Sequence, residues 1–203
     1  MNFVVLIPCK NLDRGKSRLA SCLSSRSRRA LCEFFLCRTL DVATAAVGPE
    51  SVRVITGDPR VAAIAAEYRV AAIPDGDADL NGALTRGRAH VLGEGGERAG
   101  LILPIDLPLA TPAALAQVAA APEEAVIVPD ENADGTNILR LAPAAFRQFR
   151  FTYGPRSHAA HNACAHEIGI RMRSVRDPLL MFDVDTPAQY RRWAAHDPAW
   201  SPG

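Results

Sequence analysis

Short apolar runs alternate along the chain with longer segments in which apolar residues recur at the spacing of a helix. The short runs are typical of strands buried on both faces, and we expect strands at residues 3–7, 52–56, 70–73, 101–105, 126–129 and 138–141. Shorter extended segments are expected at residues 171–175 and 181–184. Because strands and helices alternate, the pattern predicts an α/β fold with a mostly parallel sheet and helices on both faces.

Capping residues, prolines and glycines mark where the helices begin and end. Ser24 or Ser25 can cap a long helix that Gly48 ends. A threonine followed by a proline, at residues 111–112 and 186–187, is typical of a helix start, and the second pair opens a capping box. Further helices are expected at residues 59–68, 81–92 and 155–168.

Length and composition are those of a single-domain globular protein. The chain has 203 residues, of which 48% are hydrophobic and 22% charged, and its formal net charge is +1. We expect one domain over residues 1–197 and a frayed tail over residues 198–203. The near-neutral charge gives no bulk attraction for nucleic acid or for a membrane surface, so we expect neither as a partner.

Nothing in the sequence predicts export or a membrane span. The first apolar run, residues 4–7, is too short for a signal peptide or a transmembrane helix. The five cysteines lack the paired spacing of a metal site and are odd in number, so we expect free thiols and a cytoplasmic protein. An exposed sheet edge or an apolar helix face would allow a homodimer, but no feature of the sequence requires one.

A basic loop follows the first expected strand. Lys10, Arg14, Lys16 and Arg18 lie close together there, and the chain has no lysine outside this loop. Backbone amides together with Lys and Arg side chains are the groups that bind a triphosphate. The loop is not a Walker loop, because the upstream glycine is missing at the required spacing. Alternatively, it is a solvated basic segment without a ligand.

Carboxylates stand near two further strand ends. Asp106 follows the strand expected at residues 101–105, while Asp183 and Asp185 are alternate residues of an extended segment and therefore share a face. Two like charges side by side are costly without a cation, and carboxylate oxygens suit a magnesium ion that bridges nucleotide phosphates. The alternatives are that Asp106 is a turn residue and that Asp185 only supports the start of the last helix.

Two further segments are unusual for their location. Asp134-Gly135-Thr136-Asn137 directly precedes the strand expected at residues 138–141. Gly154 and Ser157 lie at an expected helix start, where a backbone amide and a hydroxyl can bind phosphate or carboxylate. Ordinary turn chemistry, with a serine near the helix start, is the simpler alternative for the second segment.

In order over nearly the whole chain, these motifs resemble those of the 2-phospho-L-lactate guanylyltransferase family, which includes phosphoenolpyruvate and 3-phospho-D-glycerate guanylyltransferases. The motifs are Ile7-Pro8-x-Lys10, Lys16-Ser17-Arg18-Leu19, Leu80-Asn81-x-Ala83-Leu84, Asp106-Leu107-Pro108-Leu109, Gly135-Thr136-Asn137, Gly154-Pro155-x-Ser157-x-x-x-His161 and Asp183-Val184-Asp185-Thr186-Pro187. The resemblance implies a single Rossmann-like nucleotidyltransferase domain of the nucleotide-diphospho-sugar transferase type.

The resemblance also implies roles for residues of these motifs. The GTP phosphates would be held by Lys16, with Lys10 and Arg18 as helpers, and the base would be bordered by Asn81. Magnesium would be held by Asp106, Asp183 and Asp185, and the catalytic residues would be Lys16 and Asp106. The phospho-acid would be bound by Thr136, Gly154 and Ser157.

The implied reaction transfers a guanylyl group from GTP to the phosphate of a three-carbon phospho-acid, releases pyrophosphate and belongs to the biosynthesis of the deazaflavin coenzyme F-420. The candidate acids are 2-phospho-L-lactate, phosphoenolpyruvate and 3-phospho-D-glycerate, and departures from the family pattern at Cys9 and His158 bear on the choice. One alternative is a molybdopterin or sugar nucleotidyltransferase, which the missing Gly-rich loop after the first strand disfavours. The other is a non-catalytic nucleotide-binding module, which the presence of all three candidate metal ligands disfavours.

Overall fold

The computed structural model describes residues 3–197 and 199–200, and these residues form a sheet of seven strands in the order β3-β2-β1-β4-β6-β5-β7. The strands are β1 (Phe3–Pro8), β2 (Val52–Ile55), β3 (Ala71–Ile73), β4 (Ala99–Ile102), β5 (Ala125–Pro129), β6 (Thr136–Leu141) and β7 (Met172–Ser174). β6 runs antiparallel to its neighbours β4 and β5, while the other neighbouring pairs are parallel. The predicted α/β fold with a mostly parallel sheet is confirmed.

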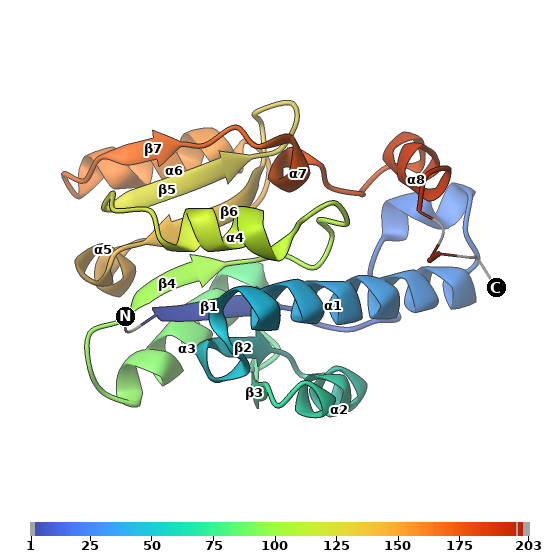
Figure 1. Ribbon diagram of the computed structural model, residues 1–203, viewed down its shortest axis with the longest axis horizontal. Helices are drawn as coiled ribbons and strands as arrows, with labels where there is room; N and C mark the ends of the chain where they lie inside the picture. The colour runs from blue at the N-terminus through green and yellow to red at the C-terminus, as the bar shows by residue number, and fades with distance from the viewer. Residues whose placement is uncertain (1–2, 198, 201–203) are drawn as a thin grey trace.

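Helices cover both faces of the sheet, as predicted (Figure 1). One face carries α1 (Ser25–Val47), α2 (Pro59–Glu67), α4 (Pro112–Ala119) and α7 (Pro178–Met181). The other carries α3 (Leu80–Gly93), α5 (Pro143–Gln148) and α6 (Ser157–Glu167). The last helix, α8 (Pro187–Ala194), packs on the short 3-10 helix η1 (Ser17–Ser21), and a second such turn, η2 (Pro49–Ser51), precedes β2.

The central strand β1 explains why the sequence reads there as a continuous apolar run. Val4 and Leu6 point into the core beneath α3, while Val5 and Ile7 point into the core beneath α1. All four side chains are fully buried. A strand covered on both faces has no solvent side, so hydrophobic and polar residues do not alternate.

A further apolar cluster lies beyond the sheet, where α8 meets the start of α1. The rings of Phe35 and Trp193 meet edge to face with their centroids 4.9 Å apart. Of the tail expected to be frayed, residues 198 and 201–203 lie outside the described residues. Trp200 packs against Phe34, with a centroid distance of 5.4 Å, and donates from Nε1 to the hydroxyl of Tyr190.

Two expectations about local structure need correction. The prediction of an extended segment at residues 181–184 was wrong at its first residue, because Met181 is the last residue of the short helix α7. Asp177 caps that helix and Pro178 occupies its first position, which together are a helix-start signal in the sequence. The strand predicted at 101–105 lies instead at 99–102, and α5 was missed because no side chain caps it.

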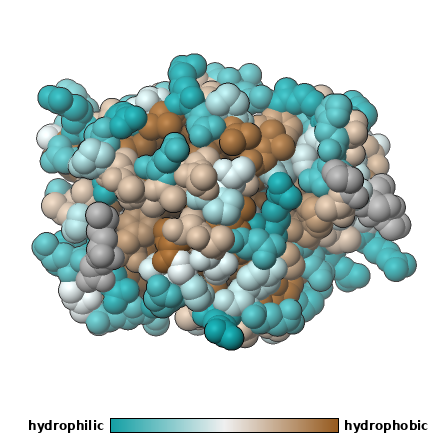
Figure 2. All heavy atoms as spheres, in the orientation of Figure 1, coloured by the Kyte–Doolittle hydropathy of each residue, from teal (hydrophilic) through white to brown (hydrophobic). Residues whose placement is uncertain are grey.

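The outer surface shows no membrane-spanning element. Among the described residues no helix is both long and apolar enough to cross a bilayer. On the face shown in Figure 2, hydrophilic residues surround smaller hydrophobic areas.

Gly100→Ala should destabilise the fold by about 1–3 kcal/mol, because a Cβ at this position of β4 would overlap the fully buried ring of Phe146. Urea unfolding measures the effect. Gly93→Ala is the matched control, since its Cβ would meet no atom within 4 Å at the end of α3, and a helical alanine should add roughly 0.5–1 kcal/mol. Equal stability changes in the two variants would contradict the packing described here.

Candidate active site

The parallel strands β1 and β4 bring the basic loop and Asp106 to the same edge of the sheet. The segments that follow Pro8 and Ile102 leave neighbouring strands in the same direction (Figure 1). The backbone N–H of Val184 donates to the carbonyl oxygen of Asp106 at 3.1 Å, which adds the segment before α8. Three stretches that are far apart in the sequence therefore meet at this edge, as expected for a ligand site of an α/β sheet.

Lys16 lies between two of the predicted carboxylates. Its Nζ is 2.6 Å from Oδ2 of Asp106 and 2.8 Å from Oδ1 of Asp185, and its side chain is only 6% exposed. Burial lowers the pKa of Lys16, but the two carboxylates outweigh burial and hold the pKa above its ordinary value. Arg18 reaches the second oxygen of Asp185 at 3.3 Å. The side chain of Asp185 therefore pairs with two cations, so Asp185 does more than support the start of the last helix.

Asp183 lies close enough to Asp106 and Asp185 for their charges to shift its pKa. Burial first, and then the carboxylates of Asp106 and Asp185, raise the pKa of Asp183 to about 6. Gln189 donates from Nε2 to Oδ1 of Asp183 at 3.1 Å, and its Oε1 accepts the backbone N–H of Asp185 at 3.1 Å. Because Gln189 also completes the predicted capping box, the start of α8 orients both aspartates.

The donor chemistry of these three carboxylates fits a hard divalent cation, since magnesium prefers oxygen ligands. Within residues 3–197 and 199–200, however, no three His, Cys, Asp or Glu side chains are gathered as a ready-made metal site. The ammonium group of Lys16 lies between Asp106 and Asp185 instead. The predicted metal ligands are thus neighbours, and Lys16 supplies the positive charge between two of them.

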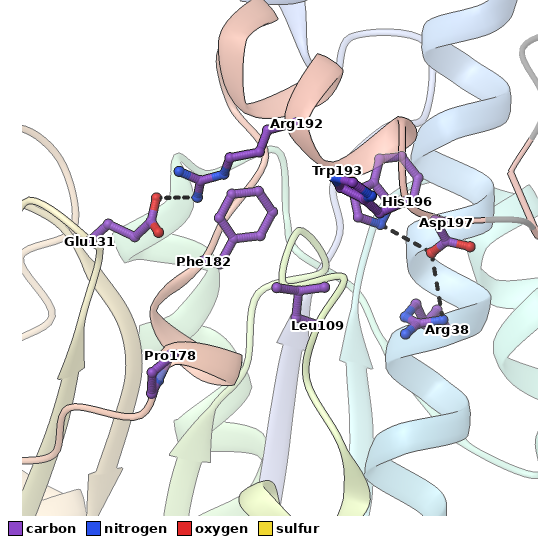
Figure 3. Close-up of a pocket in the computed structure, with 9 residues that line it drawn as sticks. All are labelled: Arg38, Leu109, Glu131, Pro178, Phe182, Arg192, Trp193, His196 and Asp197. Atoms are coloured by element: carbon purple, nitrogen blue, oxygen red, sulfur yellow. Dashed lines mark hydrogen bonds and ion pairs between the residues drawn. The ribbon is translucent and has the colours of Figure 1, made fainter.

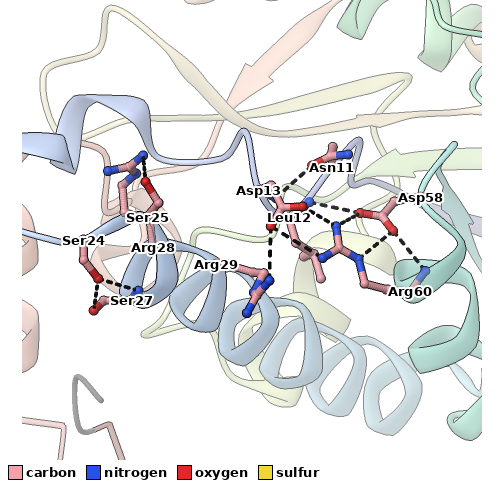
Figure 4. Close-up of polar contacts among 10 residues, drawn as sticks. All are labelled: Asn11, Leu12, Asp13, Ser24, Ser25, Ser27, Arg28, Arg29, Asp58 and Arg60. Atoms are coloured by element: carbon pink, nitrogen blue, oxygen red, sulfur yellow. Dashed lines mark hydrogen bonds and ion pairs between the residues drawn. The ribbon is translucent and has the colours of Figure 1, made fainter.

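Asp58 and Arg60 hold the basic loop in place from α2 (Figure 4). Asp58 caps α2, and its carboxylate also accepts the backbone N–H of Leu12 at 3.4 Å. Arg60 joins Asp58 to Asp13 with N···O distances of 2.8 Å and 2.7 Å. Arg29 of α1 pairs with Asp13 at 3.7 Å. The loop is therefore tied to a helix on either side.

Two cavities adjoin at the charged group. The first, of about 720 Å³, lies along the basic loop and is lined by residues that include Lys10, Asn11, Arg14, Lys16, Gly57, Asp75 and Asp77. The second, of about 450 Å³, is lined by residues that include Arg18, Asp106, Asp183, Thr136, Gly154 and Ser157. Pro8 and Asp185 line both cavities, so the cavities share a wall beside Lys16.

The loop before α6 presents polar groups to the second cavity. Gly154 has a φ of 139°, which residues with a side chain rarely adopt. Ser157, the first residue of α6, is 2% exposed. The carbonyl oxygen of Asp134 accepts the backbone N–H of His158 at 3.0 Å and so ties this loop to the segment before β6, whose first residue is Thr136. The three residues expected to bind the phospho-acid therefore surround one cavity.

Asn81, expected to border the base, makes two hydrogen bonds with the backbone of Tyr153. Its Nδ2 donates to the carbonyl oxygen at 3.0 Å, and its Oδ1 accepts the N–H at 2.8 Å. In the part of the chain that the structure describes, Asn81 does not line either cavity, although its neighbour Leu80 lines the second. Its contacts join α3 to the loop before α6, and its role beside the base stays a prediction.

Several acidic residues that line the cavities were missed by sequence reasoning. Asp130 and Asp134 line the second cavity, and Asp75 and Asp77 line the first. Asp130 directly follows β5, so the strand-end rule that singled out Asp106 would have found it. The same rule would have found Asp75, which stands two residues after β3. Asp134 begins the segment that contains Thr136, and Asp77 lies in a loop where no pattern marks it out.

A different set of side chains lines a further cavity, of about 640 Å³, beside α8 (Figure 3). Its arginines are paired: Arg192 with Glu131, and Arg38 with Asp197. The guanidinium of Arg192 also stacks over the ring of Phe182, 4.2 Å from the centroid. Both arginines thus have acidic partners, whereas Lys10 and Arg14 beside the basic-loop cavity form no ion pair with any described residue, so that cavity suits a polyanion better.

A mostly parallel sheet with a basic loop after its first strand and clustered carboxylates at the strand ends is the arrangement expected of a nucleotidyltransferase. The family described as guanylyl transferase, CofC like, matches residues 3–196, and the chain belongs to this family of guanylyltransferases. The phosphoenolpyruvate guanylyltransferase of Rubrobacter xylanophilus is 36% identical over 198 residues, which are 96% of this chain and 95% of the relative.

Solved structures agree with the fold. A nucleotidyl transferase from Methanothermobacter superimposes with a TM-score of 0.70 at 16% identity, covering 96% of this chain and 97% of the other. A Mycobacterium tuberculosis protein crystallised with manganese gives a TM-score of 0.58 at 19% identity, covering 97% and 100%. These similarities confirm the predicted nucleotidyltransferase fold.

Lys16→Met should lower kcat by roughly 100-fold or more, because it removes a preorganised positive charge while keeping the length of the side chain. Lys10→Met is the comparison, since it removes the same charge from an exposed side chain of the same loop. Steady-state kinetics of nucleotidyl transfer measure both. A smaller loss for Lys16→Met than for Lys10→Met would show that the buried ammonium is not central to the reaction.

The tie between α2 and the basic loop should weaken in acid. The hydrogen bond from Arg60 lowers the pKa of Asp58 below its ordinary value, so the unfolded chain binds the proton more readily. Its ionised form therefore stabilises the fold above about pH 4, and this contribution is lost as the pH falls through the folded-state pKa. Asp58→Asn, which keeps a capping side chain, should flatten that part of the pH dependence in urea unfolding; unchanged curves would refute it.

Proposed function

We propose that this guanylyltransferase transfers the guanylyl group of GTP to the phosphate of phosphoenolpyruvate and releases pyrophosphate. The observation behind the proposal is the pair of adjoining cavities with Lys16 at their shared wall. A nucleotide on one side and an acceptor on the other would bring the reacting atoms together at that wall. The relatives named phosphoenolpyruvate guanylyltransferase, at 34–36% identity, support the choice of acid.

The first cavity is suited to GTP. Lys10, Arg14 and Lys16, with the backbone amides of the loop, offer positive charge and donors to a triphosphate. Asp75 and Asp77 line the same cavity, and their carboxylates can accept from N1–H and the 2-amino group of guanine. Adenine has an acceptor at N1 and no 2-amino group, so a carboxylate there favours guanine.

The second cavity is suited to the acid. Thr136 and Ser157 offer hydroxyl groups at the start of a strand and of a helix, and Gly154 allows the backbone to approach closely. Phosphoenolpyruvate carries a phosphate and a carboxylate on a three-carbon frame, so two anionic groups need donors. A cavity of about 450 Å³ accommodates an acceptor of that size.

The charge of the second cavity supports a role for a divalent cation. Five aspartates and one arginine are among its lining residues: Asp106, Asp130, Asp134, Asp183, Asp185 and Arg18. An anionic acid would be repelled unless further positive charge were present. We infer that magnesium, held by Asp106, Asp183 and Asp185, would supply that charge and neutralise the phosphates. The fold relative crystallised with manganese supports a divalent ion.

The chemistry needs no covalent enzyme intermediate. An oxygen of the acceptor's phosphate attacks the α-phosphorus of GTP, a new P–O bond forms, and the bond to the departing pyrophosphate breaks. Lys16 stabilises negative charge at the shared wall, where Asp106 and Asp185 fix its ammonium group. The basic loop and the hydroxyl side chains hold the two anions in position for an in-line displacement.

The family resemblance extends the proposal to the pathway. The product would enter the biosynthesis of the deazaflavin coenzyme F-420, and 2-phospho-L-lactate and 3-phospho-D-glycerate remain alternative acceptors. We propose that the enzyme acts in the cytoplasm. All five cysteines are free thiols, which fits a reducing compartment. A homodimer stays a prediction.

Pyrophosphate release from GTP, measured with each acid in turn, tests the function. We expect turnover with GTP and phosphoenolpyruvate, loss of turnover when the metal is chelated, and at least a tenfold preference for GTP over ATP and CTP. Turnover with CTP or ATP but not with GTP would contradict guanylyl transfer. Turnover with a sugar phosphate in place of every phospho-acid would contradict the proposed acceptor.

Ser157→Ala should raise the KM for phosphoenolpyruvate by roughly 10-fold, because the hydroxyl would donate to an ionised group of the acid. The KM for GTP should change much less. Ser174→Ala, an exposed serine at the end of β7, is the matched control and should leave both constants unchanged. Equal increases in the two KM values for Ser157→Ala would remove this residue from the acid site.

A further inference from the structure

His161 contacts the hydroxyl group of Thr136, a residue that lines the second cavity. It follows Ser157 by four residues, so both side chains project from the same face of α6. Its Nδ1 is 2.9 Å from Oγ1 of Thr136, and its Nε2 is 3.0 Å from the backbone nitrogen of Thr152. His161 is completely buried, and the ring of Tyr153 meets it edge to face at 4.7 Å.

These contacts determine which ring nitrogen of His161 carries the proton. The backbone N–H of Thr152 can only donate, so Nε2 must accept and is unprotonated. Burial, with a smaller effect of His158, lowers the pKa of His161 to about 4, which keeps the ring neutral near neutral pH. A neutral imidazole bears one proton, and that proton is therefore on Nδ1.

The hydrogen-bond direction at Thr136 follows from this tautomer. Nδ1–H of His161 donates to Oγ1 of Thr136, so the Thr136 hydroxyl accepts from the ring and keeps its own proton free to donate elsewhere. Among the described residues no other group makes a side-chain hydrogen bond with that hydroxyl. Thr136 is 8% exposed and lines the second cavity. The remaining direction for its proton is into that cavity.

We propose that His161 is a positioning residue, which fixes the hydroxyl of Thr136 as a hydrogen-bond donor to an anionic oxygen of the phospho-acid. The ring acts through Thr136 and does not touch the substrate. The proposal rests on the phospho-acid transfer proposed above, and it adds a reason for the acid to bind at Thr136: a hydroxyl that already accepts from His161 is oriented to donate to phosphate or carboxylate, and no rotation is needed on binding.

Two substitutions at His161 separate its two hydrogen bonds. His161→Gln keeps an acceptor near Nε2 for Thr152 but no longer donates to Thr136, whereas His161→Asn keeps a donor near Nδ1. We expect His161→Gln to raise the KM for phosphoenolpyruvate roughly 10-fold, with much smaller effects on kcat and on the KM for GTP. His161→Asn should bring the KM for phosphoenolpyruvate most of the way back to the wild-type value. His166→Gln, an exposed histidine of the same helix, is the control.

The Thr136→Val background tests whether His161 acts through that hydroxyl. Once the hydroxyl is gone, adding His161→Gln should raise the KM for phosphoenolpyruvate no further. Independent effects of the two substitutions would overturn the proposal. It would also be overturned if His161→Gln lowered kcat, raised the KM for both substrates and lowered the thermal stability together. The latter pattern is that of a merely structural residue.

Nitrogen-15 NMR of the wild-type histidine side chains provides a test that needs neither a variant nor turnover. We expect the spectrum of His161 to show the proton on Nδ1, and a spectrum of the Nε2–H tautomer would overturn the proposal. Calorimetric measurement of phosphoenolpyruvate binding tests the positioning role of His161 separately from the proposed function. If wild type binds this acid about tenfold more tightly than His161→Gln yet transfers no guanylyl group, the proposed reaction fails and the positioning role stands.

Discussion

The buried contact of Lys16 with Asp106 and Asp185 is the interaction on which the rest of the site depends. The three residues of this contact come from the first loop, the segment after β4 and the segment before α8, so they meet only when the sheet and the last helix are both in place. Buried ion pairs contribute little net stability, because desolvation offsets their attraction. A cluster of this kind is therefore better explained by its chemistry than by the stability of the fold.

Keeping one ammonium between two carboxylates requires a rigid loop. Lys16 itself has a left-handed backbone conformation, with φ 53° and ψ 40°, which residues with side chains adopt at a cost. The ties that Asp58 and Arg60 make to the loop compensate for this cost from α2. At the other side, Gln189 fixes the backbone and the carboxylate of the acidic segment. Rigid support on both sides is what a preorganised charge needs.

The sequence predicted those parts of the site that depend on strand ends. The basic loop and Asp106 follow apolar runs, and the parallel sheet was expected to gather them. Asp58 and Gln189 were not foreseen as site supports, because each looks like an ordinary capping residue and its second contact is made across the fold. For Thr136, only the family resemblance indicated a role, since its partner His161 lies on another element and no periodicity links them.

Charge balance would explain why a histidine and a threonine hydroxyl, and not an arginine, serve the second cavity, where we propose that the phospho-acid binds. The second cavity already contains five aspartates, and the one arginine among its lining residues, Arg18, is paired with Asp185 at 3.3 Å. A further guanidinium there would form an ion pair with one of these carboxylates and would not be available to a substrate. A neutral, buried ring avoids that competition. The buried ring of His161 forms no ion pair with these aspartates, because it is neutral and its Nδ1 is engaged with Thr136, whose hydroxyl it orients toward an incoming anion.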